Sequence, residues 1–456
     1  MLPVSLKERA RTLVLVCCAL AGGGFASPAA AEEPAPWASG KNLEQLVTLY
    51  RHFHQSPELS LHEKQTAARL AKELAAAGAK VTPDVGGHGV VAVLANGKGP
   101  TLLIRTDLDA LPVTEQTGLA YASKVVIKDD QGKEVGVMHA CGHDIHITCL
   151  VGVARYLSEN KDRWSGTVVF IGQPAEEKGE GAKLMLDAGL FKRFPRPDYA
   201  LALHVDPSLA SGSVGYLAGY ALANVDSVDI TIRGRGGHGA FPHMTIDPIV
   251  EAARLVLDLQ TIVSREIKPT EAAVVTVGSI HAGAKHNIIS DQCQLQLTVR
   301  SYSDEVRKHL LEAIKRKAIA TAASSDAPEP TVEVSEGTPA MFNDKGLVER
   351  LTPVFRRVLG EEHVVPSEPS MGGEDFSRYG LAGVPSFMFR IGAIEQKRLD
   401  RYEKLGQSPP SLHSPLFYPD AEPTLATGVT AMASAALDLL GKEAAAGKAK
   451  NSAASK

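Results

Sequence analysis

The sequence predicts an α/β fold in which a smaller α+β domain is inserted into a larger domain with a mixed, mostly parallel sheet. Two observations support this. Short apolar runs alternate with helical patterns over the first half of the chain, and this rhythm changes between about residues 217 and 336 before it returns. Alternating strands and helices are typical of a parallel sheet covered on both faces. A chain of 456 residues is long enough for two domains.

The larger domain begins with helical patterns over residues 43–50 and 63–77, the second of which ends at Gly78. Four short apolar runs then predict strands over residues 90–94, 102–104, 168–171 and 200–204. Helical patterns at 147–157 and 181–188 alternate with them. Polar residues follow three of these runs, namely Asp107 and Asp109, Glu176 and Glu177, and His204. Because ligands gather beyond the carboxyl ends of parallel strands, we expect these side chains to share a site.

The inserted domain is predicted from a different order of elements. Val228, Ile230 and Ile232 alternate with polar residues like a half-exposed strand, and a helix follows Pro248. The remaining elements are strands at 273–280 and 291–300, a helix at 304–323 and a strand at 330–335. This order is the split βαβ or ferredoxin-like pattern. The expected boundaries are 41–216 and 337–440 for the two parts of the larger, catalytic domain and 217–336 for the insertion.

Both ends of the chain are predicted to lie outside the fold. Lys7, Arg9 and Arg11 precede an apolar run at 13–20, and small residues at 29–31 end in an A-x-A pattern. This pattern predicts a signal peptide over residues 1–31 and export to a periplasm or beyond, with no membrane span after cleavage. Val16 before Cys17 fits a lipid-attachment signal poorly. Residues 32–40 form a linker, and the Ala/Lys-rich residues 441–456 form a disordered tail.

The composition indicates a soluble globular enzyme. Apolar residues make up 44% of the chain and charged residues 22%, and the net charge is −4. Without a basic block, a nucleic-acid partner has little electrostatic support. Removal of the signal peptide leaves Cys141, Cys149 and Cys293, an odd and dispersed set that does not form a disulfide framework.

The stretch "MHACGHDIH", residues 138–146, carries the first indication of chemistry. Cys141 and His143 flank Gly142, which lets the backbone bend so that both side chains face one point. A thiolate with an imidazole suits zinc and is compatible with manganese, cobalt or nickel. His139 and His146 are interpreted as polar residues of a turn or helix start, with Asp144 as a cap. Alone, a Cys-x-His pair is more often structural.

Further residues make a metal site the better interpretation. Glu176 and Glu177 are adjacent carboxylates that tolerate each other beside a cation, so that one can bind metal while the other handles protons. Taken alone, they would be a solvated charge cluster. His204 and His413 are weak signals separately. Together, one Cys, three His and one Glu are enough to hold two divalent ions with positions open for water. A closed structural zinc site is disfavoured because its ligands are usually close in sequence.

Eight segments occur in the order found in the M20 metallopeptidase family. They are "RTDLDALPVTEQTG", "MHACGHDIHIT", "GQPAEE", "ALHVDP", "GRGGHGAFPH", "HNIISD", "MGGEDFS" and "LHSPLF". The chain most resembles the amidohydrolase subgroup, such as hippurate hydrolase and the hydrolases of indole-acetyl amino acids, over residues 43–440. The resemblance implies a two-domain hydrolase of N-acyl amino acids with two divalent ions per subunit (Mn, Zn, Co or Ni). It also leaves open a dipeptidase, an N-acetyl-diaminopimelate deacetylase or a non-catalytic acyl-amino-acid binding homologue.

The same resemblance implies roles for single residues. The implied metal ligands are Cys141, His143, Glu177, His204 and His413. Glu176 would be the general base, and Asp109 would orient a ligand. Asp107 stands where the wider family has a metal-binding His, so it is an open candidate.

The inserted domain would complete the site. The resemblance implies that His238 reaches the active site of the neighbouring subunit in a homodimer and binds the oxyanion. Asn287 and Arg300 would hold the substrate carboxylate, although both could equally be scaffold. Gly373, after Gly372, would let the backbone approach the substrate beside Glu374.

Overall fold

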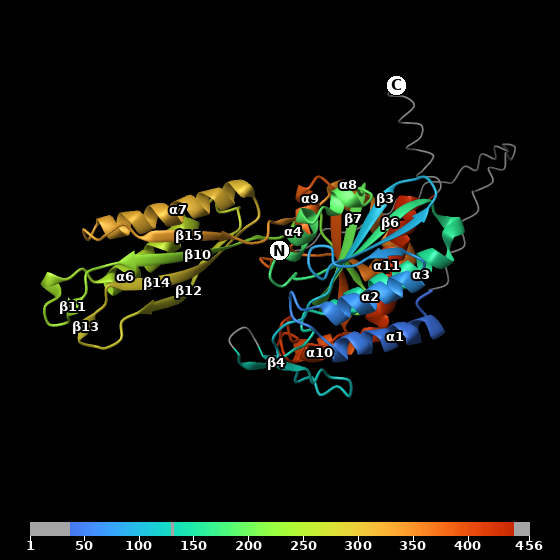
Figure 1. The fold of residues 1–456 in the computed structure, drawn as a ribbon, viewed down its shortest axis with the longest axis horizontal. Helices are drawn as coiled ribbons and strands as arrows, with labels where there is room; N and C mark the ends of the chain where they lie inside the picture. Colours follow the sequence, from blue (N-terminus) through green and yellow to red (C-terminus); the bar gives the residue numbers. More distant parts are fainter. Residues whose placement is uncertain (1–36, 129–131, 442–456) are drawn as a thin grey trace, which may run out of the picture. The chain divides into compact units, whose positions relative to one another are not determined.

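The computed structural model describes residues 37–128 and 132–441. The predicted signal peptide, the predicted tail apart from Gly441, and most of the linker lie outside the described residues. The largest sheet has eight strands in the order β1-β2-β6-β3-β7-β18-β8-β17 (Figure 1). In that order their bounds are Lys80–Thr82, Val90–Asn96, Gly166–Gln173, Thr101–Asp107, Tyr199–Ala210, Ser386–Ile394, Val214–Tyr216 and Val364–Pro366.

The pairing of these strands is mixed and mostly parallel, as predicted. β3 runs parallel to β6 and β7, β7 to β18, and β8 to β17. The pairs β1–β2, β2–β6 and β18–β8 are antiparallel. The carboxyl ends of β3, β6 and β7 therefore point to one edge of the sheet.

Helices cover both faces of this sheet. One face packs against α1 (Gly40–Gln55), α2 (Lys64–Ala76), α3 (His143–Glu159), α8 (Lys345–Leu359) and α11 (Ala421–Leu440). The other face packs against α4 (Gly181–Asp187), α5 (Leu190–Arg193) and α9 (Ser377–Leu381). Alternate residues of each strand serve the two faces, so that Leu102 and Ile104 belong to one hydrophobic cluster and Leu103 to the other.

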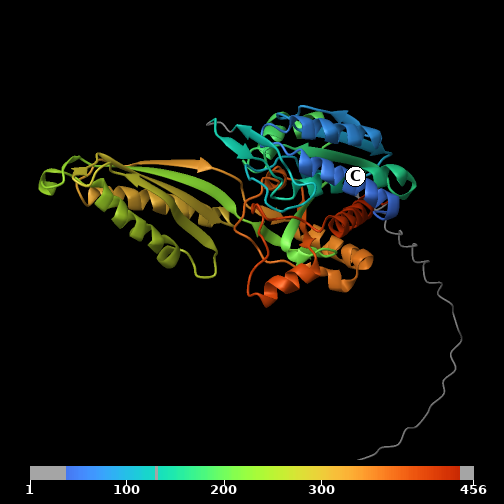
Figure 2. The same cartoon turned by 90° about the horizontal axis from the view of Figure 1, so that it is seen from below.

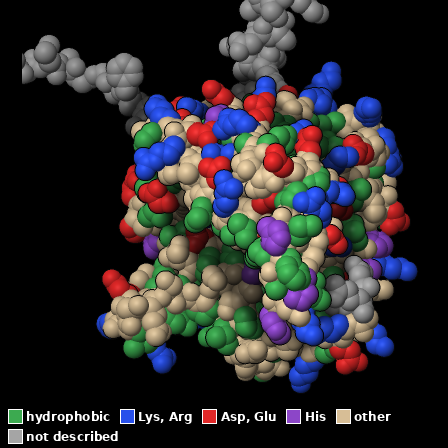
Figure 3. All heavy atoms as spheres, turned by 90° about the vertical axis from the view of Figure 1, so that its left-hand side faces the viewer, with side chains coloured by type: hydrophobic (Ala, Val, Ile, Leu, Met, Phe, Trp, Pro, Cys, Tyr) green, Lys and Arg blue, Asp and Glu red, His purple; other side chains and the backbone are tan. Residues whose placement is uncertain are grey.

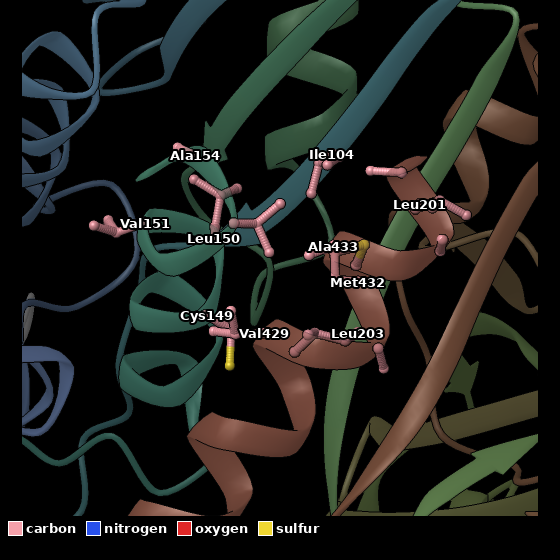
Figure 4. Close-up of a cluster of buried hydrophobic side chains, with 14 of the residues drawn as sticks. Ile104, Cys149, Leu150, Val151, Ala154, Leu201, Leu203, Val429, Met432 and Ala433 are labelled. Carbon is pink, nitrogen blue, oxygen red and sulfur yellow. The ribbon is translucent and has the colours of Figure 1, made fainter. Parts of the chain in front are cut away.

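The core behind the predicted site lies between α3, α11 and the sheet. Figure 4 shows Cys149 and Leu150 of α3 beside Val429 of α11 and Leu203 of β7. α3 is buried on nearly every side, because its residues 145–154 are almost all apolar or small. The close fit explains Gly428, since a Cβ there would lie 2.6 Å from the sulfur of Cys149.

One described helix is long and apolar enough to span a membrane by length and composition. It is α11, and most of that stretch is buried inside the protein. A buried core helix passes the same test, so this finding is weak support for a membrane segment.

A second, four-stranded sheet forms from residues 224–336. It comprises β10 (Asn224–Arg233), β12 (Ala273–Ala282), β14 (Gln292–Ser301) and β15 (Thr331–Glu336), in the order β12-β14-β10-β15 with every pair antiparallel. α6 (Pro248–Thr261) and α7 (Asp304–Ala323) lie on one face of it (Figures 1 and 2). Caps fix where both helices begin, because Asp247 accepts a hydrogen bond from the Ile249 amide and Ser303 from the Val306 amide.

Three two-stranded ribbons and α10 (Gln396–Lys404) are the remaining strands and α-helices of the described residues. β9 (Gly219–Leu222) pairs with β16 (Met341–Asn343) where the chain enters and leaves the four-stranded sheet. The other pairs are β11 (Gly237–His238) with β13 (Ile288–Ile289) and β4 (Val126–Lys128) with β5 (Glu134–Gly136). α10 has no buried residue.

Candidate active site

The predicted site residues of the larger domain converge at the carboxyl ends of β3, β6 and β7. Asp107 is the last residue of β3, and Glu176 follows the end of β6 at Gln173 by three residues. His204 lies inside β7, which continues to Ala210, so the prediction that this strand ends at His204 was wrong. β7 pairs with β3 only as far as Ala202, so His204 lies beyond the part of the strand that β3 covers.

Cys141 and His143 meet through a glycine turn at the start of α3. Gly142 has φ +80, and a Cβ there would lie 2.5 Å from a methyl carbon of Val205. Both the backbone conformation and the space therefore require glycine. Cys141 precedes this turn and His143 is the first residue of α3, which places both ligand candidates at the buried end of the helix.

The five predicted metal ligands form two adjoining groups. Cys141, His143 and His204 make one group, and Cys141, Glu177 and His413 make the other, with ligand atoms within 4.8 Å of one another in each. The Cys141 sulfur lies 3.6 Å from His204 Nε2. His413 Nε2 lies 3.5 Å from Glu177 Oε2. Cys141 belongs to both groups, so its sulfur is the atom that two ions could share.

The histidine tautomers and two unsatisfied atoms fit a metal. His143 Nδ1 lies 2.7 Å from the carbonyl oxygen of Asp109, and His204 Nδ1 lies 2.8 Å from that of Val205. Each ring donates from Nδ1, which leaves Nε2 as the free lone pair. Among the described residues, His143 Nε2 and Glu177 Oε1 are buried without a hydrogen-bond partner. Such burial costs about 1–3 kcal/mol per group, and a divalent ion would satisfy both atoms.

Asp109 holds the loop that carries the two glutamates. Its carboxylate accepts hydrogen bonds from the backbone amides of Glu176, at 3.2 Å, and Glu177, at 3.0 Å. It also accepts one from the Ser60 hydroxyl at 2.6 Å. Burial alone would raise the pKa of Asp109, but the hydrogen bond and charge of His143 lower it below its usual value. Asp109 therefore lies behind His143 and Glu177 rather than among the candidate ligands.

Asp107 is occupied by other partners. Its Oδ2 accepts a hydrogen bond from Arg105 Nη1 at 2.6 Å, and its Oδ1 lies 2.8 Å from His146 Nδ1. His146 Nε2 in turn accepts from the Val205 amide at 3.0 Å. Both side chains are thus satisfied within the protein, although they also form a possible ligand group with His143.

The start of α3 differs from the sequence interpretation in two respects, its cap and its first residue. His146 lies in the first turn of the helix, as expected, but Asp144 is not its cap, because the cap position is Gly142. The helix begins at His143, four residues earlier than predicted. The Asp144 carboxylate lies 2.7 Å from His54 Nδ1 of α1, so it forms an ion pair between two helices.

Glu176 lies beside a buried acidic group that the sequence interpretation missed. Carboxylate oxygens of Glu176, Glu374 and Asp375 lie within 4.8 Å of one another. The buried Arg105 donates from Nη2 to Glu374 at 2.8 Å and to Asp375 at 3.2 Å. Burial, followed by the charges of Glu374 and Glu177, raises the pKa of Glu176 well above its usual value. A carboxyl in this environment holds a proton readily, as a general base that returns its proton must.

The environment of the protein alone also shifts the thiol and the second glutamate toward their neutral forms. Burial, with the nearby charge of Glu177, raises the pKa of Cys141 well above its usual value. Burial raises the pKa of Glu177 to about 7. A divalent cation reverses this preference, because it stabilises the thiolate and carboxylate that bind it.

The structure does not bring the predicted residues of the inserted domain to this cluster. His238 and Asn287 are exposed, and Arg300 is half-buried on β14, where it donates to the Thr298 hydroxyl. Among the residues that the structure describes, none of these three forms a hydrogen bond or ion pair with the cluster. Figure 3 shows histidine side chains beside hydrophobic ones on the face it views.

Gly373 lies against the ribbon that leads to the inserted domain. A Cβ on Gly373 would lie 2.6 Å from a methyl carbon of Val225 and 2.7 Å from Thr338 Oγ1. A contact within the protein therefore explains the absence of a side chain at Gly373, and the approach of a substrate to its backbone stays a prediction.

Comparisons with known proteins identify the family of this chain. Residues 103–404 match the family described as peptidase family M20/M25/M40. The N-acetyl-L-cysteine deacetylase of Bacillus subtilis is 37% identical over 76% of this chain and 80% of its own length. IAA-amino acid hydrolase ILR1-like 2 of Arabidopsis thaliana is 34% identical over 89% of this chain and 87% of its own.

Solved structures give the same result. A dinuclear metal-binding peptidase of the M20 family from Bacillus subtilis superposes with a TM-score of 0.71 at 30% identity, covering 87% of this chain and 98% of that one. A putative aminohydrolase from methicillin-resistant Staphylococcus aureus has a TM-score of 0.77 at 33% identity, covering 87% and 96%. With its mixed sheet, its buried Cys/His/Glu cluster and these relatives, the chain belongs to peptidase family M20/M25/M40 and is an amide-bond hydrolase of its amidohydrolase subgroup.

Proposed function

We propose that this protein hydrolyses the amide bond of N-acyl amino acids. The observation that carries the proposal is the pair of ligand groups that share Cys141, with the carboxylate of Glu176 beside them. Cys141, His143, Glu177, His204 and His413 would hold two divalent ions, because their free atoms face one another and two of those atoms have no other partner. The ions would polarise the amide carbonyl and acidify water.

Glu176 is the general base of the proposed reaction. It takes the proton of the attacking water and returns it to the leaving amine, which requires a carboxyl that is stable in both protonation states. Its environment of Glu374 and Glu177 supports this role. Asp109 keeps Glu176 and Glu177 in place through their backbone amides, so its contribution is to position them.

The substrate class is tested with a panel. Protein stripped with a chelator is supplied separately with Mn, Zn, Co or Ni and assayed on N-acetyl, N-benzoyl and indole-acetyl amino acids, with dipeptides and N-acetyl-diaminopimelate as competing classes. We expect turnover of N-acyl amino acids that depends on added metal. Turnover of dipeptides alone would overturn the proposed class. A relative from Limosilactobacillus reuteri, at 35% identity, is an N-acetyldiaminopimelate deacetylase, which is why that substrate is included.

We further propose that the four-stranded domain is a ferredoxin-like lid and the surface for homodimerisation. Its order of strand, helix, two strands, helix and strand fits that pattern. Eight large hydrophobic side chains among the described residues 224–336 are exposed: Phe241, Met244, Ile249, Val250, Leu257, Ile280, Ile288 and Val334. In this proposal a second copy of the chain covers these side chains, because exposed apolar surface is stabilised when an interface buries it. In a dimer, His238 would complete the partner's site, and Asn287 and Arg300 would bind the substrate carboxylate.

The proposal includes export to the periplasm or beyond. It rests on the charged, apolar and small-residue segments at 1–31, which lie outside the described residues. Determining the N-terminal residue of the mature protein tests it, and Glu32 is the expected first residue.

A further inference from the structure

Thr338 lies where the chain leaves the four-stranded sheet and returns to the larger domain. It follows β15, which ends at Glu336, and precedes β16, which begins at Met341. Its carbonyl accepts a hydrogen bond from the Val225 amide at 2.9 Å, and the Gly337 amide donates to the Val225 carbonyl at 3.0 Å. The outgoing and returning strands are therefore joined at this residue, which is buried.

The Thr338 side chain fits between two glycines from separate loops. A Cβ on Gly179 would lie 2.8 Å from Thr338 Cγ2, and one on Gly373 would lie 2.7 Å from Thr338 Oγ1. Real Cβ atoms do not approach other atoms this closely, so neither position accepts a side chain unless a neighbour moves. One threonine thus contacts two loops through different atoms.

Both loops carry carboxylates of the site. The Gly179 amide donates to the Glu176 carbonyl at 2.7 Å, which closes the turn containing Glu176 and Glu177. Gly373 directly precedes Glu374, the residue whose charge lies beside Glu176. Thr338 therefore contacts the loops on both sides of the proposed base.

Hydrogen bonding does not explain this threonine. Among the described residues, Thr338 Oγ1 is buried without a partner, a state that costs free energy. Backbone conformation does not explain Gly373 either, because its φ is not positive, unlike that of Gly179 at +66. Both glycines lie against atoms of the Thr338 side chain, so the shape of this side chain accounts for both contacts.

We propose that Thr338 is a positioning residue that couples the paired segments at Val225 and Gly337, where the chain enters and leaves the four-stranded sheet, to the two loops holding Glu176 and Glu374. This inference rests on the proposed role of Glu176. The coupling acts through both branches of the side chain, with Cγ2 on Gly179 and Oγ1 on Gly373.

Three substitutions separate shape from hydrogen bonding. Thr338→Val keeps both branches and removes the hydroxyl, Thr338→Ser removes only Cγ2, and Thr338→Ala removes both. We expect kcat on the best N-acyl amino acid to fall about tenfold or more in Thr338→Ala, since small displacements of catalytic groups cost up to about 10²-fold. The kcat of Thr338→Ser should lie between those of wild type and Thr338→Ala, and the kcat of Thr338→Val should stay within about twofold of wild type. The metal content of all three variants should be unchanged. Equal losses in the Val and Ala variants, or none in the Ala variant, would overturn the proposal.

A second measurement does not need activity. Hydrogen exchange of the amides in residues 176–181 and 372–376 should speed up at both loops in Thr338→Ala and stay as in wild type in Thr338→Val. Unchanged exchange at these loops in Thr338→Ala refutes the coupling, whatever the kinetics. Should wild type turn over no substrate of the panel, the proposed function fails, and the exchange result still decides the role of Thr338. If Thr338→Ala does not fold, the exchange rates of Thr338→Ser are compared with those of Thr338→Val instead.

A matched pair tests the contact itself. Gly179→Ala introduces a methyl group against Thr338 Cγ2, with added strain from the positive φ. In a Thr338→Ser background that carbon is absent, so the same substitution should lower kcat several-fold less. Equal losses in both backgrounds would show that the two residues do not interact.

Discussion

The candidate metal ligands of the larger domain and the candidate site residues His238 and Asn287 differ in how firmly the surrounding protein fixes their side chains. Each candidate ligand of the larger domain except His413 is at least partly buried, and His143 and His204 are fixed by hydrogen bonds from Nδ1 to backbone carbonyls. His238 and Asn287 are exposed. The cluster is therefore organised by one chain alone, whereas His238 and Asn287 need something further to fix them.

This difference separates two kinds of contribution to catalysis. Groups held by a packed core are in place before substrate arrives, and their loss removes chemistry. Groups on an exposed surface become fixed in orientation only when another surface buries them. In a two-fold dimer, the same surface of each subunit is buried against the other. The predictions that follow test each side of the comparison, beginning with the largest expected effect.

Replacing the proposed base should have the largest effect. Glu176→Gln removes proton transfer and keeps all five candidate ligands, so kcat should fall about 10²–10⁴-fold or more while metal content, measured by mass spectrometry, stays as in wild type. Asp109→Asn is a useful comparison, because it weakens the hydrogen bonds that hold the loop of Glu176 and Glu177 but leaves the Glu176 carboxylate itself unchanged. Near-normal turnover by a metal-replete Glu176→Gln protein would rule out this assignment.

His238→Ala tests the exposed side of the comparison. Loss of one oxyanion donor costs roughly 10²–10³-fold in kcat. If His238 acts across a dimer, mixing His238→Ala with Glu176→Gln and allowing subunits to exchange should restore activity. In each hybrid dimer one site would hold an intact Glu176 together with the partner's intact His238, and the other site would hold neither. Such a dimer should recover as much as about half the activity of a wild-type dimer. Absence of recovery despite demonstrated exchange would mean that His238 acts within its own chain or not at all.

Cys141→Ser should weaken metal binding rather than remove the base. A hydroxyl replaces thiolate poorly, so affinity should fall by about tenfold or more and the preference should move from softer to harder ions. Titration of stripped protein with Zn and with Mn measures both changes. Cys149→Ser is the matched control, since Cys149 packs in the core away from the ligand groups. Ready modification of Cys141 by a thiol reagent in metal-loaded protein would show that its sulfur is not a ligand.

Local patterns in the sequence predict elements well and long-range contacts poorly. The helix predicted at 304–323 matches α7, because a capping Ser303 and a continuous pattern define it locally. Cys141, His143, Glu176, Glu177, His204 and His413 were found because the segments that carry them occur together in the order of the M20 family, and the structure brings them together. The contact of Arg105 with Glu374 was missed, since it joins residues 269 positions apart. The one local signal was an arginine within an apolar strand, which implies a buried counter-charge.

The smallest effect concerns the packing that supports the cluster. His54 of α1 lies between two carboxylates, with Nδ1 2.7 Å from Asp144 and Nε2 3.2 Å from Glu115. Burial alone would lower the pKa of His54, but hydrogen bonds to Asp144 and Glu115 raise it from 6.5 to about 9. The ion pair with Asp144 joins α1 to the first turn of α3, next to His143.

The sign of the effect follows from this raised pKa. Between pH 6.5 and about 9 the folded protein keeps a proton on His54 that the unfolded chain releases. Stability from this group is therefore complete below pH 6.5 and declines as pH rises through 9, by at most about 1.4 kcal/mol per pH unit. His54→Asn keeps a donor for Asp144 without the charge. The difference in unfolding free energy between wild type and His54→Asn, from urea denaturation of metal-free protein, should be largest near pH 6.5 and shrink toward pH 10. A difference that stays constant over this range would mean that His54 is neutral in the folded protein, and that α1 and the start of α3 are held together by packing and neutral hydrogen bonds alone.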